Sequence, residues 1–156
     1  MKISDILTED MVITELQGES KEQIIGAMID LISGSQKVID KQKVREAIFE
    51  RERIMSTGVG NGFAIPHGKT DAVSDIVAAF AITAQPIDYQ ALDEKPVRLV
   101  FLLVGKDNMI GPHIKLLSRI SRLMNKEEFR KRLLNLKTSK EIIDMFKQEE
   151  ASYFEV

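Results

Sequence analysis

The chain has 156 residues, near the ~150 typical of one domain, and 44% are hydrophobic and 29% charged. This composition is typical of a soluble globular domain and excludes a disordered or fibrous chain. Lys and Arg number 22 against 24 Asp and Glu, giving a formal net charge of -2. This argues against nucleic acid as the main partner, because proteins that bind a phosphate backbone are usually basic. With no cysteine present, disulfides, thiolate metal sites and a cysteine nucleophile are excluded.

The sequence shows no targeting or membrane segment. Its first residues lack the long uncharged apolar stretch that a secretory signal needs. The longest apolar run, Val97 to Val104, is interrupted by Arg98 and is far shorter than the ~20 residues of a membrane span. We therefore expect a cytoplasmic protein that does not insert into a membrane.

Two helices are predicted in the first third of the chain. Ser20-Lys-Glu-Gln23 has the pattern of a capping box and precedes apolar residues at helical spacing, with a stop at Gly34. Asp40 is the expected N-cap of the second helix. The buried stripe of that helix is predicted to comprise Val44, Ala47, Ile48 and Met55.

Strands are predicted in the middle of the chain. A short strand over Phe63–Ile65 should end at Pro66, which cannot donate to a strand ladder. The apolar runs Ile76–Thr83 and Val97–Val104 are typical of strands buried on both faces. Gln85–Asp88, between them, is predicted to form a turn.

Three more helices are predicted after the strands. Pro112 suits the first position of a helix that runs to about Asn125, Glu127–Asn135 forms the next, and the capping box Thr138-Ser-Lys-Glu141 opens the last. The first of these should bury Ile114, Leu117, Ile120, Leu123 and Met124. This order predicts one α/β domain over residues 1–156, a sandwich with a central mixed β-sheet flanked by helices.

The segment Ser56–Gly68 carries the strongest functional signal. Its three alternating glycines, from Gly58 to Gly62, allow another group to approach the backbone closely. His67 follows Pro66, and neutral imidazole is a good nucleophile near neutral pH. A loop histidine that only makes a local hydrogen bond is the commoner case. This setting instead predicts an exposed histidine at the carboxyl end of a strand, where sheets of this class bind ligands.

Four further residues are candidates for holding an anion near His67. If the preceding proline starts its helix, His113 lies in the first turn, where unpaired N–H groups and the helix dipole attract an anion. Arg51 offers a fork of donors suited to a phosphoryl group, and Ser56 and Thr57 offer hydroxyls. Each also has a simpler interpretation: a ring packed on the sheet, a solvated helix arginine, or ordinary turn residues.

Other classes of site find less support. Residues 113–137 are rich in Lys and Arg, but a solvated helix face is favoured over a nucleic-acid or docking face because Phe129 is the only interleaved aromatic residue. The glycine pattern is neither a dinucleotide fingerprint nor a P-loop. His67 and His113 lack the short-spaced partner ligand typical of zinc sites. We therefore expect no cofactor and no metal.

Three sequence blocks together resemble a known family: Glu50-Arg-Glu-Arg53, Ser56-Thr-Gly-Val-Gly-Asn-Gly-Phe-Ala-Ile-Pro-His-Gly68, and Gly111-Pro-His-Ile-Lys-Leu-Leu117. In order and spacing they are similar to the fructose/mannitol type of phosphotransferase system (PTS) enzyme IIA. That family includes sugar-specific members and a nitrogen-regulatory branch. The resemblance covers essentially the whole chain and implies a mixed sheet flanked by helices.

The resemblance also implies a phosphotransferase component that works through a phosphohistidine. His67 would accept a phosphoryl group from the histidine-containing phosphocarrier protein and pass it to a cysteine of an enzyme IIB domain. Arg51 would contact the phosphoryl group, and His113 would lie beside His67. Two protein partners must each reach His67, so we expect a shallow exposed depression with a partly apolar rim. Phe63 and the segment Met109–Ile110 are candidates for that rim.

Fructose-like sugar uptake is the favoured function. The alternative is a nitrogen-regulatory enzyme IIA, whose phosphorylation state controls its binding to target proteins. A more remote alternative is a metal- or anion-binding module built on the two histidines. The sugar, the acceptor and the oligomeric state are not encoded in any motif of this chain.

Overall fold

A mixed six-stranded sheet between helices forms the frame of the protein in the computed structural model, which describes residues 1–154. In chain order the elements are α1 (Ile3–Ile6), the 3-10 turn η1 (Glu9–Met11), β1 (Val12–Leu16), α2 (Lys21–Ile32), α3 (Lys41–Ile54), β2 (Gly58–Gly60), β3 (Phe63–Ala64), β4 (His67–Lys69), β5 (Val77–Ile87), β6 (Val97–Gly105), α4 (Ile110–Met124), α5 (Glu127–Leu134) and α6 (Ser139–Phe154).

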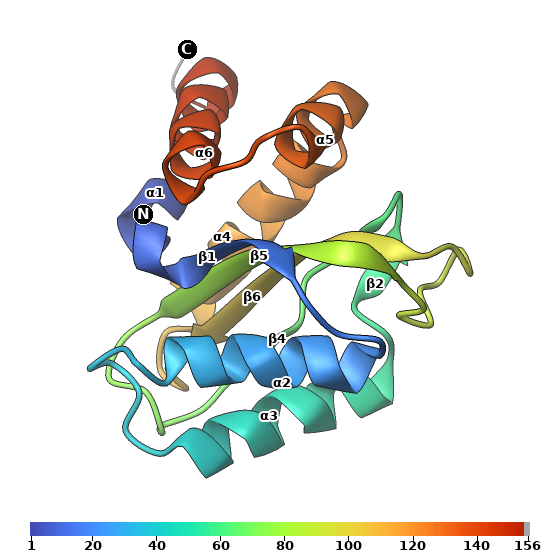
Figure 1. The fold of residues 1–156 in the computed structure, drawn as a ribbon. Coiled ribbons are helices and arrows are strands. Elements are labelled where there is room, and N and C mark those ends of the chain that lie inside the picture. Colours follow the sequence, from blue (N-terminus) through green and yellow to red (C-terminus); the bar gives the residue numbers. More distant parts are fainter. Residues whose placement is uncertain (155–156) are drawn as a thin grey trace.

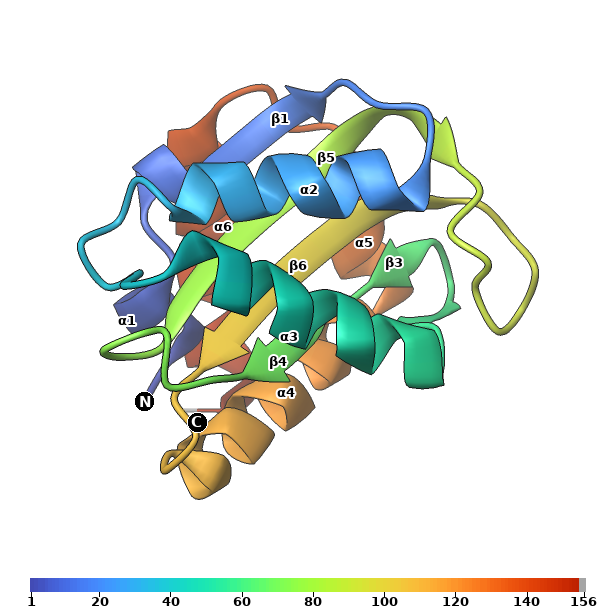
Figure 2. The same cartoon turned by 90° about the horizontal axis from the view of Figure 1, so that it is seen from below.

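The helices form a layer on each face of the sheet. Helices α2 and α3 cover one face, and α1, α4, α5 and α6 lie on the other (Figure 1). The view from below shows α2 and α3 side by side across the strands (Figure 2). The predicted α/β fold, with a mixed sheet flanked by helices, is confirmed.

Strand order in the sheet is β1-β5-β6-β3-β2, with β4 also paired to β6. The long strands β5 and β6 are antiparallel, whereas β1 runs parallel to β5. Strands β3 and β4 both run parallel to β6 and lie one after the other along it. The short strand therefore does end before Pro66, but the chain returns to the same ladder at His67, opposite Leu103.

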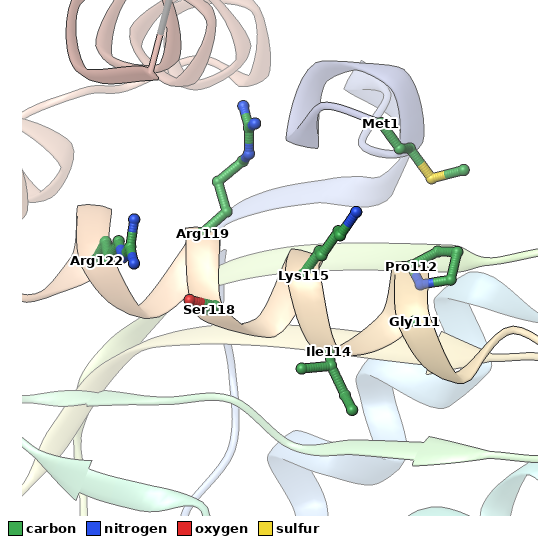
Figure 3. A pocket seen from close by; sticks show the side chains of 8 residues that line it. All are labelled: Met1, Gly111, Pro112, Ile114, Lys115, Ser118, Arg119 and Arg122. Atoms are coloured by element: carbon green, nitrogen blue, oxygen red, sulfur yellow. The ribbon is translucent and has the colours of Figure 1, made fainter.

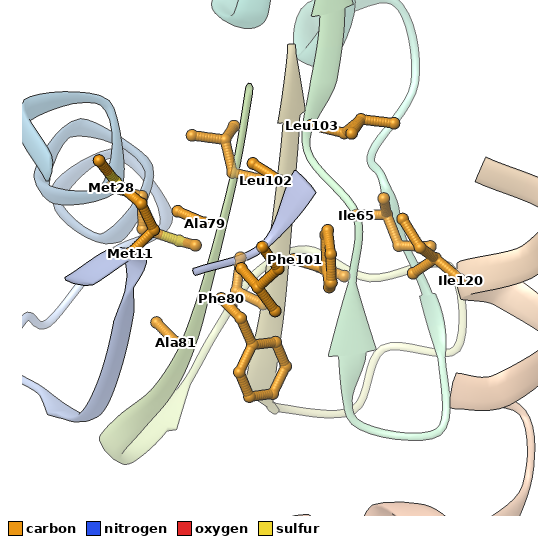
Figure 4. Packing of buried hydrophobic residues seen from close by; sticks show 14 of the residues in the cluster. Met11, Met28, Ile65, Ala79, Phe80, Ala81, Phe101, Leu102, Leu103 and Ile120 are labelled. Carbon is orange, nitrogen blue, oxygen red and sulfur yellow. The ribbon is translucent and has the colours of Figure 1, made fainter. Parts of the chain in front are cut away.

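The central strands are buried on both faces, as their apolar sequences predict. Four phenylalanines pack edge-on or tilted between the sheet and α6, with Phe80–Phe146 and Phe129–Phe146 ring centres 5.2 and 5.3 Å apart. Figure 4 shows Phe80 and Phe101 on neighbouring strands within this packing. Within residues 1–154, no helix combines the length and apolar character needed to cross a membrane.

The predicted helix caps are present. Ser20 Oγ accepts the Gln23 N–H at 3.2 Å, and Asp40 accepts the Lys43 N–H at 3.2 Å. At the last helix the box is reciprocal: the Glu141 N–H donates to Thr138 Oγ1, and the Thr138 N–H donates to the Glu141 carboxylate. Local side-chain chemistry therefore sets where these helices begin.

Several predicted details are wrong. Gln85 to Ile87 continue β5 rather than form a turn, and β1, which the sequence analysis does not predict, buries its two end residues and exposes part of its middle. Met55 lies one residue beyond the end of α3 in an extended conformation and is 56% exposed. The predicted buried stripe of that helix therefore ends earlier.

Helix α4 is rotated and extended relative to its prediction. It begins at Ile110, so Pro112 is its third residue and still lies in the first turn, where a missing N–H costs nothing. Ile114 is 59% exposed, and Leu116 is buried instead. The buried face runs from His113 through Leu116 to Ile120, which directs the His113 ring inward.

Candidate active site

An open depression of about 530 Å³ lies where α3, β4 and the start of α4 meet. It is lined by Ala47, Glu50, Arg51, Ile54, His67, Gly68, Lys69, Asp107, His113, Ile114 and Leu117. Three of the five predicted site residues, Arg51, His67 and His113, therefore share one site although they come from separate parts of the chain.

His67 is placed by the short strand β4. It is the first residue of that strand, near the carboxyl end of β6, and its side chain is half-buried. A side chain on the next residue, Gly68, would bring its Cβ within 3.3 Å of the Ala47 backbone. Glycine is needed there because it lets α3 pack directly on β4, which brings the end of that helix to the depression.

One hydrogen bond assigns the tautomer of His67. Its Nδ1 lies 2.8 Å from the carbonyl oxygen of Ile65. A carbonyl only accepts, so in the neutral ring Nδ1 carries the proton and donates it. The lone pair is then on Nε2, which makes Nε2 the nucleophilic atom of the ring.

The surroundings keep that ring neutral. Burial lowers the pKa of His67 below its usual 6.5, and the hydrogen bond to Ile65 opposes this shift. The Arg51 guanidinium lowers the same pKa further, whereas the Glu52 carboxylate raises it. The net shift is downward, so the nucleophilic form predominates at neutral pH.

His113 lies beside His67, with the two ring centres 5.9 Å apart and the planes inclined by 51°. Its own N–H is paired with the Met109 carbonyl at 3.1 Å, so the backbone of His113 offers no free donor of the kind predicted. The ring itself is 3% exposed and packs on Gly105, where a Cβ would lie 2.5 Å from His113 Nδ1.

Nδ1 of His113 is buried and, within residues 1–154, has no hydrogen-bond partner. Burial, with smaller effects from His67 and Lys69, lowers the pKa of His113 to about 4. The ring is therefore neutral at pH 7. Because a buried N–H without an acceptor is costly, the tautomer with the proton on Nε2 is favoured for this ring, which makes Nε2–H its donor.

Arg51 lies in the last turn of α3 and curls back over the helix end. Its Nη1 donates to the Met55 carbonyl at 2.8 Å, which satisfies one of the carbonyl groups left unpaired at a helix C-terminus. The guanidinium has further N–H groups and lines the depression. These remaining N–H donors, held in a planar fork, suit the binding of an anion in the depression.

Ser56 and Thr57 do not line the depression. Thr57 is buried, with its Oγ1 2.5 Å from the Glu52 carboxylate and 2.9 Å from the Tyr89 hydroxyl, and its N–H donates to Glu52 at 2.8 Å. Ser56 Oγ accepts the Gly58 N–H at 3.2 Å. Both side chains therefore make hydrogen bonds that hold the loop after α3, and neither reaches His67.

Glu52 is the centre of a buried network that the sequence analysis missed. Besides Thr57, its carboxylate accepts from Lys21 Nζ at 2.8 Å and from the Tyr89 hydroxyl at 3.3 Å. Burial and the charge of Glu52 raise the pKa of Tyr89, which remains a neutral donor. A signal existed in the sequence, because Val44, Ile48 and Glu52 follow one another at four-residue intervals on the buried face of α3.

The rim of the depression is apolar in part. Ile54 is 80% exposed and Ile114 is 59% exposed, and both line the depression. Of the residues predicted for the rim, Phe63 is fully buried, and Met109 packs against the core. Ile110 is exposed at the first turn of α4 but does not line the depression.

The site thus combines a neutral nucleophile, a cation and a neutral N–H donor in an open hollow. This set suits the binding and uptake of a small anionic group. Within residues 1–154, no group of three His, Cys, Asp or Glu side chains is arranged to hold a metal ion.

The sequence matches the family model described as "Phosphoenolpyruvate-dependent sugar phosphotransferase system, EIIA 2" over residues 5–149. The chain belongs to this family. The resemblance found in the sequence blocks is therefore confirmed, and the chain is an enzyme IIA of the phosphotransferase system.

Relatives of this enzyme IIA fall in both branches of the family. It is 37% identical over 148 residues to the fructose-specific EIIABC component of Bacillus subtilis, covering 95% of this chain but 23% of that longer protein. It is 36% identical to the fructose-specific EIIA component of Haloferax volcanii, covering 92% of this chain and 93% of the relative. It is 34% identical to the nitrogen regulatory protein of Bradyrhizobium diazoefficiens, covering 85% and 86%.

Solved structures agree with this placement. The nitrogen regulatory protein IIA-Ntr of Neisseria meningitidis superposes with a TM-score of 0.87 at 29% identity, covering 92% of this chain and 98% of that one. The enzyme IIAMTL of Escherichia coli, solved in complex with phosphorylated enzyme IIBMTL, gives a TM-score of 0.78 at 17% identity, covering 92% and 99%. The latter similarity shows the shared fold.

Removing Arg51 should raise the pKa of His67. In an NMR titration of the wild type we expect the His67 midpoint below 6.5, and a higher midpoint in Arg51→Ala, because the cation disfavours imidazolium. Arg53→Ala is the matched control, since Arg53 is in the same helical turn but does not line the depression. An unchanged midpoint in Arg51→Ala would contradict this electrostatic role.

His113 should make the protein less stable as the pH falls. The unfolded chain binds a proton on this histidine near pH 6.5, whereas the folded protein does so only near pH 4, so stability decreases as the pH falls across that window. The expected loss is on the order of 2–3 kcal/mol. Urea unfolding at pH 7, 5.5 and 4 should show a weaker pH dependence in His113→Gln. Equal dependence in both proteins would count against a buried neutral His113.

Thr57 should matter for folding more than for the chemistry of the site. Thr57→Val removes a hydroxyl from the buried Glu52 carboxylate and should cost about 1–3 kcal/mol in urea unfolding. Ser56→Ala, which alters a half-buried turn, should cost less than about 1 kcal/mol. Wild-type stability together with impaired phosphorylation in Thr57→Val would restore the anion-binding role first predicted for it.

Proposed function

We propose that this enzyme IIA is a phosphocarrier in which His67 accepts a phosphoryl group on Nε2 and passes it to another protein. The supporting observation is the hydrogen bond between His67 Nδ1 and the Ile65 carbonyl, which leaves Nε2 unprotonated in a depression shared with Arg51 and His113. Membership of the phosphotransferase system family supports the same chemistry.

In the proposed first step, the donor is the phosphohistidine of the histidine-containing phosphocarrier protein. The Nε2 lone pair of His67 attacks phosphorus, and the P–N bond to the donor breaks. The electron pair of that bond returns to the donor ring. The His67 ring becomes positively charged. Its Nδ1–H remains hydrogen-bonded to the Ile65 carbonyl, and this bond stabilises the charge.

Arg51 and His113 would act on the transferred group rather than on the ring. Phosphoryl transfer requires mainly positioning and stabilisation of charge on the equatorial oxygens. The guanidinium supplies a cation and the Nε2–H of His113 supplies a neutral donor, both at the wall of the depression. A preorganised donor of this kind is worth about 10²–10³ in rate.

In the second step, the phosphoryl group leaves His67 for a nucleophile on an acceptor, and Nε2 recovers its lone pair. We propose a cysteine of an enzyme IIB domain as this acceptor, with fructose-like sugar uptake as the process served. The Escherichia coli structure solved with phosphorylated enzyme IIBMTL supports such a partner. The exposed Ile54 and Ile114 beside His67 offer apolar contacts that either partner could bury.

A nitrogen-type regulatory role is the second candidate. The similarity to the Bradyrhizobium diazoefficiens protein and to the Neisseria meningitidis structure favours it about as strongly as the fructose-specific relatives favour transport. In that case phosphorylation of the same His67 would change the charge of the depression and thereby control the binding of a target protein.

Incubation with phosphoenolpyruvate, enzyme I and the phosphocarrier protein should place an acid-labile label on the wild type. We expect no label in His67→Ala, and labelling slowed about 10²-fold or more in Arg51→Ala, because the cation no longer stabilises the transferring group. Arg53→Ala should be labelled at the wild-type rate.

Labelled His67→Ala, or an unlabelled wild type with active upstream proteins, would disprove the phosphocarrier function. Rapid passage of the label to an enzyme IIB domain would then favour sugar transport. Stable retention of the label with every enzyme IIB tested would favour regulation.

A further inference from the structure

A second hollow, of about 690 Å³, lies on the outer side of α4. It is lined by Met1, Gly111, Pro112, Ile114, Lys115, Ser118, Arg119 and Arg122, a set without any carboxylate. Figure 3 shows Lys115 and Arg119 projecting from the same side of the helix, toward the N-terminal segment, with Ile114 on the other side. Lys115, Arg119 and Arg122, spaced four and three residues apart, form one cationic stripe on α4.

Two of the three cations of the stripe lack the ion pairs that several other cations of the C-terminal region make. Lys126, Lys131 and Lys140 pair with carboxylates at 2.8, 3.2 and 3.4 Å. By contrast, the side chains of Lys115 and Arg122 have no ion pair or hydrogen bond with any residue from 1 to 154.

The charge of Arg119 is partly neutralised by a carboxylate buried beneath it. Its Nη1 lies 3.4 Å from the Glu150 carboxylate, which is buried and also accepts the N–H groups of Ile3 and Ser4. Glu150 therefore holds α1 against α6, and it offers little negative charge to the surface. The second hollow, called the groove from here on, therefore remains cationic.

This groove adjoins the His67 depression across one helix. Ile114 lines both hollows, while His113 faces the depression and Lys115 faces the groove. A specific protein interface covers about 800 Å² of each partner. A partner of that size docked over His67 would be large enough to reach the first turns of α4 and the stripe.

The chemistry of the groove favours an acidic protein surface over a nucleic acid. Three cations lie beside exposed apolar groups, of which Met1 and Ile114 are each 59% exposed. Apolar contact mixed with a few Arg and Lys is typical of protein interfaces. Nucleic-acid surfaces need longer basic tracts, usually with stacking aromatics, and no aromatic residue lines this groove.

We propose that the stripe Lys115, Arg119 and Arg122 binds carboxylate side chains of the protein that docks over His67, and so selects among phosphoryl donors and acceptors by charge. This inference rests on the proposed phosphocarrier function. The stripe accelerates encounter with an acidic partner, and the effect weakens with salt because exposed charges are screened.

The test is the double charge reversal Lys115→Glu with Arg122→Glu, which leaves Arg119 and its buried partner intact. The control is Lys43→Glu with Lys147→Glu, an equal change of net charge at exposed positions of α3 and α6 that line neither hollow. The probes are the histidine-containing phosphocarrier protein and a fructose-type enzyme IIB domain. Second-order rates of transfer from the first and to the second are measured in about 50 and about 300 mM KCl.

We expect the stripe variant to react with at least one probe about tenfold more slowly than the control variant in low salt, with a smaller difference in high salt. First-order hydrolysis of its phosphohistidine should match the wild type, because His67, Arg51 and His113 are untouched. Rates within about twofold of the control with both probes, or a loss that salt does not reduce, would overturn the proposal.

Two further outcomes are distinct. A wild type that takes no label from active upstream proteins would disprove the phosphocarrier function, and the docking proposal with it. A labelled wild type whose stripe variant transfers normally, but loses binding to a single-stranded RNA, would overturn only the docking proposal and would assign the stripe to nucleic acid.

Discussion

The chemistry of the site depends on the carbonyl of Ile65 being available to His67. Strand β3 ends at Ala64, and the ladder with β6 resumes through the Pro66 carbonyl, which accepts the Leu103 N–H at 3.0 Å. The intervening Ile65 carbonyl is left free to accept the proton of His67 Nδ1 at 2.8 Å. Because Pro66 lacks an N–H, the strand is interrupted at this point, and the interruption leaves the lone pair of the His67 ring on Nε2.

Two charged residues of α3, Arg51 and Glu52, have opposite effects on the pKa of His67. The Arg51 guanidinium suits an incoming phosphoryl group but lowers the pKa of the ring, while Glu52 raises it. Glu52 is fixed between Lys21 and Thr57 at the end of the same helix, so a buried network anchors the turn that carries Arg51. Arg51 and Glu52 are therefore adjacent in sequence but differ in burial. Arg51 would bind the anion, and Glu52 opposes the lowering of the His67 pKa by Arg51.

Helix α4 connects the site with its surroundings. Its first turns present His113 to the depression, Ile114 to the rim and Lys115 to the outer groove. Three consecutive residues of a helix point in directions about 100° apart, which allows one turn to line the depression, the rim and the outer groove. A partner that contacts the rim therefore meets a cationic surface on one side of His67.

Sequence alone predicted His67, Arg51 and His113 as site residues, which the structure brings into one depression, as well as the order of the main helices and strands. These follow from local signals: caps, apolar runs, the Ile65-Pro66-His67 junction and the spacing of the family blocks. Whether Ile114 or Leu116 faces the core, and whether Thr57 meets an anion or a buried carboxylate, was decided only in the tertiary structure. Neighbouring residues of a helix or loop have similar local propensities, so the packing of distant segments selects which side chain is buried, and only that packing joins Lys21, Glu52 and Tyr89 into one network.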